Sequence, residues 1–179
     1  MKKLLSIIIL GAISLASYAQ VFKTSTGKVS FESKTPAENI AATNSAVKAA
    51  VDSKRGKVQF AITINSFQFS KSLMQKHFQE NYMETTQYPT SSFAGAIVNN
   101  KSVKWGTDGT YNVSVKGKLT MHGKTNSVTI PGKIIIKDGK PTLNANFSVK
   151  PADYGIKIPG AVAEKIAKSV DIAVICACE

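Results

Sequence analysis

The sequence predicts an all-β protein, an extended eight-stranded antiparallel barrel with a helix over one end. Residues 111–121 alternate apolar and polar side chains without interruption. Successive side chains of a strand point to opposite faces, so this segment indicates a strand with one apolar and one wet face. At ~3.4 Å per residue it would run roughly 35 Å, about twice the ordinary length. Long strands repeated along 179 residues favour a closed barrel with a deep apolar interior.

A secretory signal peptide is predicted over residues 1–19. A short basic start is followed by an apolar run over residues 4–16, and small residues precede a cut between Ala19 and Gln20. The apolar run is too short to span a bilayer comfortably. We therefore expect export to a bacterial periplasm and a single domain over residues 20–179.

The first part of this domain is expected to form three strands. Residues 28–33 and 57–65 alternate cleanly. Residues 40–52 are ambiguous, because their alanines suit a helix whereas the valines alternate as in a strand. Their apolar parity changes along the segment, which makes a bulge near Asn44 plausible.

A helix is expected from about Ser70 to Met83. Ser70 or Ser72 can cap its first turn through a side-chain oxygen. Apolar residues that include Phe78 and Tyr82 recur at spacings of three and four. A helix between two strands must bury that stripe, so it is expected to cover a barrel opening.

The second part of the domain is expected to hold five strands and a short C-terminal helix. The strands are predicted over residues 91–99, 111–121, 126–136, 143–149 and 170–178. Val103 and Trp105 are interpreted as the start of a further strand, which is interrupted directly after Trp105. Pro131 cannot donate to a ladder, which argues for an edge or a bulge at that point. The short helix is predicted over residues 159–169.

The chain is basic, with a formal net charge of +12. One interpretation is transient contact with an anionic membrane surface. The other, which we favour because the lysines are scattered, is that they keep the outer strand faces soluble. Aromatic residues do not interleave with basic clusters, so nucleic acid is not an expected partner.

No catalytic or metal-binding pattern is visible, and we expect a non-enzyme without cofactor or metal. His77 and His122 are the only histidines, and each is more typical of a surface or packing residue than of a base or ligand. Cys176 and Cys178 match no usual zinc spacing. They are expected to be buried free thiols rather than a disulfide, because residues i and i+2 of one strand pair poorly. Cys178 lies nearer the end and should react faster.

The apolar interior is therefore the candidate site, either as a packed core or as a ligand cavity. The cavity is favoured because small inward residues, namely Gly95, Gly117, Gly132 and Ala145, are mixed with large ones. The candidate ligand-binding residues are Phe60, Ile62, Ile64, Phe78, Tyr82, Phe93, Ile97, Val113, Val115, Leu119, Met121, Val128, Ile130, Phe147 and Val174.

Three stretches carry a resemblance to a known family. They are NYMETTQYPTSSFAG at residues 81–95, GKLTMHGKTNSVTIP at 117–131 and NFSVKPADYGI at 146–156. In this order and spacing they resemble the YceI-like family, the lipocalin-shaped polyisoprenoid-binding proteins of the bacterial envelope. The resemblance implies a lipocalin-like barrel with a helix across one end, an isoprenoid or similar chain inside it, and no reaction.

The expected function is an exported monomer or homodimer that holds a hydrophobic small molecule, an isoprenoid or a fatty lipid, for sequestration or transport. Two alternatives remain open from the sequence. One is a structural or stress-related envelope barrel without a ligand, and the other is an enzyme acting on a bound lipid.

Overall fold

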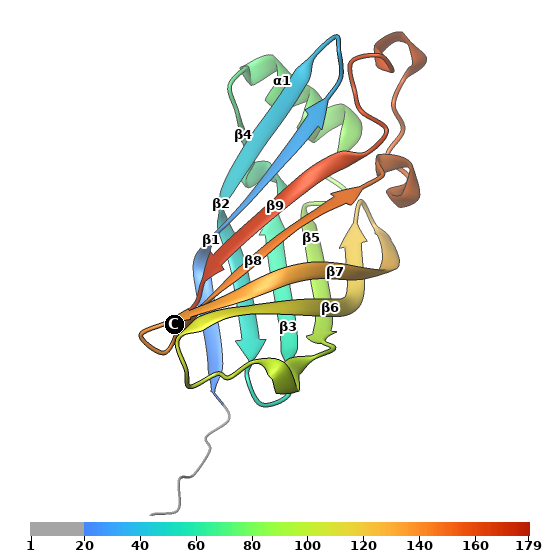
Figure 1. The fold of residues 1–179 in the computed structure, drawn as a ribbon. Helices are drawn as coiled ribbons and strands as arrows, with labels where there is room; N and C mark the ends of the chain where they lie inside the picture. Colours follow the sequence, from blue (N-terminus) through green and yellow to red (C-terminus); the bar gives the residue numbers. More distant parts are fainter. Residues whose placement is uncertain (1–19) are drawn as a thin grey trace, which may run out of the picture.

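A computed structural model describes residues 20–179, and the predicted signal peptide lies outside the described residues. Eight antiparallel strands close into a barrel in the order β1-β9-β8-β7-β6-β5-β3-β2, with β2 pairing back to β1 (Figure 1). The strands are β1 (Val21–Lys34), β2 (Asn39–Asp52), β3 (Lys57–Thr63), β5 (Thr90–Ile97), β6 (Gly109–Met121), β7 (Lys124–Lys137), β8 (Lys140–Val149) and β9 (Val170–Ala177). The two-residue β4 (Gln68–Phe69) pairs with β2 outside this ring. The predicted fold class is confirmed.

β6 and β7 form the long hairpin that the alternating sequence predicts. They pair without a break from Gly109–Ile136 to Met121–Lys124. His122 and Gly123 make the turn with φ of 51° and 72°. Two successive left-handed residues are typical of the tight turn whose twist matches a hairpin.

β7 is an edge over its first half. It pairs with β8 only from Gly132–Ala145 to the far hairpin, so the part up to Pro131 has a ladder with β6 alone. The edge expected at this proline is confirmed. The short turn η4 (Pro151–Tyr154) approaches the free edge, where the Asn126 amide donates a hydrogen bond of 2.9 Å to the Asp153 carbonyl.

The segment with ambiguous sequence is a strand, β2, and the predicted bulge is present. The pairing with β1 passes from Gly27–Val47 to Val29–Asn44, which leaves an extra residue on β2. Asn44 is fully buried there, and its Nδ2 donates to the Thr63 carbonyl at 2.8 Å. The amide thus replaces ladder partners that the bulge removes.

The helix between β4 and β5 exists, but its start differs from the prediction. It comprises α1 (Ser72–His77), continued by the π-helical turn η2 (Phe78–Tyr82). Lys71 is the N-cap residue and no side chain caps the helix, so the predicted serine cap is wrong. Ser72 already lies inside the first turn, where its side chain cannot act as the N-cap.

Two other segments are irregular where regular structure was predicted. Residues 159–169 contain only the 3₁₀ turn η5 (Gly160–Val162), so the C-terminal helix is wrong. So short a segment, with Pro159 and Gly160 at its start, gains too little from helix propagation to offset nucleation. Val103 and Trp105 likewise follow the 3₁₀ turn η3 (Asn100–Ser102) in a loop rather than a strand.

Within residues 20–179, no helix is long and apolar enough to cross a membrane.

The end of the barrel opposite the helix is densely packed. Phe22 of β1 stacks on Trp105 with ring centroids 6.1 Å apart. Val47, Val51 and Ile136 are almost completely buried and belong to the same hydrophobic cluster. The inward faces of the strands therefore meet in a solid core over this part of the barrel.

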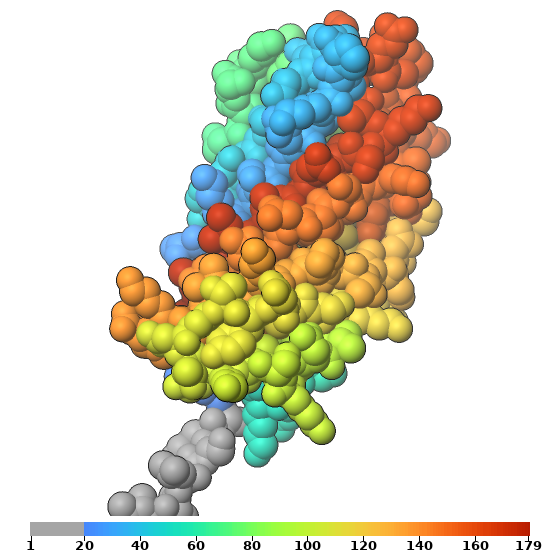
Figure 2. Space-filling view, in the orientation of Figure 1, coloured from blue at the N-terminus to red at the C-terminus, as the bar shows by residue number. Residues whose placement is uncertain are grey.

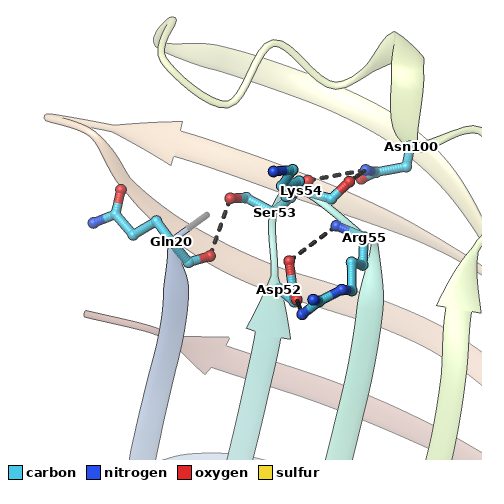
Figure 3. Close-up of polar contacts among 6 residues, drawn as sticks. All are labelled: Gln20, Asp52, Ser53, Lys54, Arg55 and Asn100. Atoms are coloured by element: carbon cyan, nitrogen blue, oxygen red, sulfur yellow. Dashed lines mark hydrogen bonds and ion pairs between the residues drawn. The ribbon is translucent and has the colours of Figure 1, made fainter. Parts of the chain in front are cut away.

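Polar contacts close the same end around the turn between β2 and β3 (Figure 3). The Asn100 amide donates to the Ser53 carbonyl at 2.9 Å, and the Ser53 hydroxyl donates to the Gln20 carbonyl at 3.0 Å. The Arg55 backbone N–H donates to Asp52 at 2.9 Å and its guanidinium pairs with the same carboxylate at 3.1 Å. These bonds tie the N-terminal strand, this turn and the η3 turn together, so this end is held shut.

Candidate functional site

The other part of the barrel encloses a cavity of about 620 Å³. All eight strands of the barrel contribute inward side chains to its lining, which is almost wholly apolar. In the space-filling view, side chains of β2 (blue), β9 (red) and the orange strands β7 and β8 cover the facing side of the barrel (Figure 2). Ligand pockets commonly occupy about 300–1,000 Å³ and are mostly apolar, so the interior has the size and chemistry of a binding site.

Of the candidate ligand-binding residues, only Val128 is absent from the lining. The residues that line the cavity are Phe60, Ile62, Ile64, Phe78, Tyr82, Phe93, Ile97, Val113, Val115, Leu119, Met121, Ile130, Phe147 and Val174. Val128 is half-buried on the part of β7 that pairs with β6 alone. β8 has already diverged from β7 there, so its parity no longer directs the side chain into the enclosed space.

The cavity is closed at one end, so it is a blind pocket and not a tunnel through the barrel. Its deepest lining residues include Val58, Ile97 and Ile134, and the packed core around Phe22 and Trp105 lies beyond them. A bound chain would therefore enter from the helix end and stop at this floor.

Two of the small inward residues do not make room for a ligand. Gly95 and Gly117 pair across β5 and β6, and a Cβ on either would lie 2.7 or 2.6 Å from the Phe93 ring. The missing side chains let the Phe93 ring lie flat against the wall. Gly132 and Ala145, by contrast, do line the cavity.

The cavity reaches the surface at the helix end, which we call the mouth. Exposed side chains that line it come from the α1 region (Lys71, Leu73, His77) and from the loop before β9 (Lys165). Leu73 is 62% exposed although it is apolar. Lys71 pairs with Glu38 of the β1–β2 hairpin at 3.4 Å, an exposed pair that contributes little to stability.

Four phenylalanine rings pack together just inside the mouth. Phe78 of η2 lies 5.4 Å from Phe31, 5.7 Å from Phe67 and 5.1 Å from Phe69, measured between ring centroids. Such offset and tilted arrangements are the favourable ones for aromatic pairs. This aromatic cluster attaches the helix to β1 and β4, as expected for a helix that covers the opening.

The comparisons with known proteins agree with this architecture. The model of the YceI-like domain matches residues 15–176. The chain belongs to the YceI-like family. No curated protein sequence matches it.

The solved structures that resemble this YceI-like barrel share its fold at low sequence identity. A polyisoprenoid-binding domain from Saccharophagus degradans, implicated in plant cell wall breakdown, has a TM-score of 0.77 at 14% identity, over 90% of this chain and 99% of that one. BcnA from Burkholderia cenocepacia gives 0.67 at 22% identity, over 83% and 94%. A Campylobacter jejuni YceI protein gives 0.51 at 15% identity, over 99% and 98%.

Several lining residues of this YceI-like protein were missed by the sequence interpretation. They include Val29, Phe31, Ile40, Phe67, Phe69, Ser91, Ile156, Ile158, Val162 and Ile166. The alternation in β1 already placed Val29 and Phe31 on one face, which is a usable signal. Val162 and Ile166 gave no such signal, because residues 159–169 were interpreted as a helix, and Ile156 and Ile158 lie in a segment for which no strand or helix was predicted.

The side chain of His122 connects three segments of the chain. Its Nε2 lies 2.6 Å from the Glu84 carboxylate and its Nδ1 lies 3.3 Å from the Tyr154 carbonyl. The Tyr88 ring covers it, with centroids 4.4 Å apart. Glu84 itself has the unusual φ of 45°. The β6–β7 hairpin is thereby tied to the end of the helix and to the η4 turn.

Cys176 and Cys178 are buried free thiols, as predicted. Burial raises the pKa of Cys176 to about 12 and that of Cys178 to about 11. The chain end is not frayed, because Lys23 and Glu179 exchange two backbone hydrogen bonds of 2.9 Å. The reason for expecting Cys178 to react faster is therefore wrong. Among residues 20–179, no three His, Cys, Asp or Glu side chains gather where they could hold a metal ion.

Proposed function

We propose that this protein binds a long apolar or amphiphilic lipid, of the isoprenoid or fatty class, inside its barrel. The observation that carries the proposal is the apolar cavity of about 620 Å³ that is closed at one end and opens at the helix. Burying apolar chain contributes about 0.8 kcal/mol per CH₂, so a long chain can bind tightly without covalent chemistry. The polyisoprenoid-binding domain of similar fold supports this class of ligand.

The contrast between the two ends of the barrel favours a ligand over an empty structural barrel. Around Phe22 and Trp105 the same eight strands fill their interior with side chains. Interiors of folded proteins are normally close-packed, and unfilled apolar volume lowers stability. The cavity is confined to the end of the barrel that has a mouth, and it is therefore best explained as space for a ligand.

We further propose that the protein acts in the periplasm, where it sequesters or carries its lipid. The predicted signal peptide and the cut before Gln20 support this. Fractionation of the native host, followed by N-terminal sequencing, tests it. The expected result is a soluble periplasmic chain that begins at Gln20, and a cytoplasmic chain that retains Met1 would contradict it.

A cavity-filling variant tests the binding function. Val115 lines the cavity on β6, whereas its neighbour Lys116 is exposed on the outer face. The indole of Val115→Trp should occupy the space of the ligand and weaken the binding of a fluorescent long-chain lipid at least tenfold. The control Lys116→Trp should bind the lipid like the wild type. Circular dichroism verifies that both variants are folded. Unchanged binding by folded Val115→Trp would place the lipid elsewhere and refute the proposal.

A further inference from the structure

One polar atom in the cavity wall is left without a partner. The Ser91 side-chain oxygen is buried, and no group within residues 20–179 forms a hydrogen bond with it. Ser91 is 5% exposed and lines the cavity. The other deeply buried polar lining residue, Ser33, accepts a hydrogen bond from the Ala167 N–H at 2.9 Å. Among the described residues, Ser91 is therefore the exception to the rule that buried polar side-chain atoms have a hydrogen-bond partner.

The strand geometry directs the Ser91 hydroxyl into the cavity. Ser91 is on β5 opposite Ile62 of β3, and it shares the inward parity of Phe93 and Ile97. All three of these neighbours line the cavity. The adjacent Ser92 has the outward parity and is exposed, but it also borders the cavity. Ser127 of β7, by contrast, is exposed and does not line the cavity, so it offers a serine outside the site.

A buried hydroxyl without a hydrogen bond is costly, and native proteins satisfy most such groups. Ser91 also lies toward the helix end of β5, away from the floor formed by Ile97 and Ile134. A ligand group that met the hydroxyl would satisfy it and would leave the apolar tail to fill the deeper part of the cavity.

We propose that Ser91 anchors the polar group of the bound lipid inside the barrel, and that this group is a neutral carbonyl, amide or hydroxyl. This inference rests on the proposed lipid-binding function and deepens it. The group is neutral because burying a charge without a charged partner is far more costly than burying a hydrogen-bonded neutral group. None of the Lys and Glu side chains that line the cavity is buried: Lys71, Lys133 and Lys165 are exposed, and Glu38 is half-buried.

Three probes of equal chain length test the inference: hexadecanamide, 1-hexadecanol and hexadecane. Each competes with a fluorescent lipid for the delipidated protein, for Ser91→Ala and for the matched control Ser127→Ala. One net hydrogen bond corresponds to about a threefold to tenfold change in affinity. Ser91→Ala should lose this factor for the amide and the alcohol and keep its affinity for hexadecane. Ser127→Ala should match the wild type for all three probes.

Equal effects of Ser91→Ala on all three probes, or no effect on any, would overturn the inference. Hexadecanoate provides a further comparison. If the charged hexadecanoate bound most tightly and depended on Lys71 and Lys165 rather than on Ser91, the head group would sit at the mouth and the inference would fall. Failure of the wild type to bind any probe would instead refute lipid binding itself. Ser91→Ala should unfold at the same or a higher denaturant concentration, because it removes an unsatisfied buried group.

Discussion

Replacing Phe78 by alanine separates the two roles of the helix, which are to stabilise the barrel and to retain the ligand. The ring has three aromatic partners, at 5.4, 5.7 and 5.1 Å. Each aromatic pair contributes about 0.5–1.5 kcal/mol. Because Phe78 is only half-buried, we take the lower part of the summed range and expect the free energy of unfolding to fall by roughly 2 kcal/mol.

The effect on the ligand follows from what the ring covers. Phe78 lines the cavity just inside the mouth, so its loss should expose the outer end of the bound chain to water. Two or three uncovered methylene groups correspond to roughly 2 kcal/mol, or about thirtyfold in affinity. Most of this change should appear in the dissociation rate, since affinity differences between related complexes are mainly differences in that rate.

Two measurements on the variant decide the matter: urea unfolding of the lipid-free protein and stopped-flow release of a fluorescent lipid to acceptor vesicles. The control is Phe22→Leu, which disturbs the stacking on Trp105 at the packed end and should destabilise the fold without faster release. If Phe78→Ala were destabilised as expected but released lipid at the wild-type rate, the helix would be a core element only and our account of the mouth would be refuted.

Two further predictions concern groups outside the cavity. His122→Ala removes the contacts to Glu84 and the Tyr154 carbonyl and should lower the free energy of unfolding by roughly 1–3 kcal/mol. An unchanged unfolding midpoint would contradict this. Burial raises the folded-state pKa of Cys176 from 9.0 to about 12, so its stabilising contribution is complete below pH 9 and is lost as the pH rises toward 12. The free energy of unfolding, measured with reductant, should therefore fall less steeply over that range in Cys176→Ala than in the wild type, and equal slopes would contradict it.

The strands could be predicted because a barrel wall imposes a two-residue alternation on the sequence. One face of each strand meets the interior and the other meets water, and β6 and β7 keep this pattern over 13 and 14 residues. The same logic identified the bulge near Asn44, where the apolar parity changes. Most of the cavity lining follows directly from which residues of the barrel strands have the inward parity.

Parity alone could not divide the interior into a packed part and a cavity. Phe22 and Trp105 share no local pattern, and they meet only because the closed barrel brings β1 beside the loop after η3. Gly95 and Gly117 look like free space in the sequence but accommodate the Phe93 ring. These outcomes depend on which side chains meet across the interior, and alternation carries no information about that.

The irregular segments were the least predictable. Apolar residues of the loop before β9, such as Val162 and Ile166, have helical spacing yet line the mouth of the cavity from a loop. Tertiary contacts with the mouth prevail over a weak local preference in so short a segment. Ser91 shows a related limit, because its inward parity is visible in the sequence while its lack of a hydrogen-bond partner is not.

Native mass spectrometry of the mature protein, combined with organic extraction, tests lipid binding most directly. The protein is purified without detergent from its native host, in parallel with Val115→Trp. We predict a complex of one chain with one long-chain lipid, recovered in the extract and strongly reduced in Val115→Trp. A spectrum of the bare chain alone, with no lipid in the extract and no uptake of added 1-hexadecanol or hexadecanamide, would contradict the proposal that the cavity is a lipid-binding site.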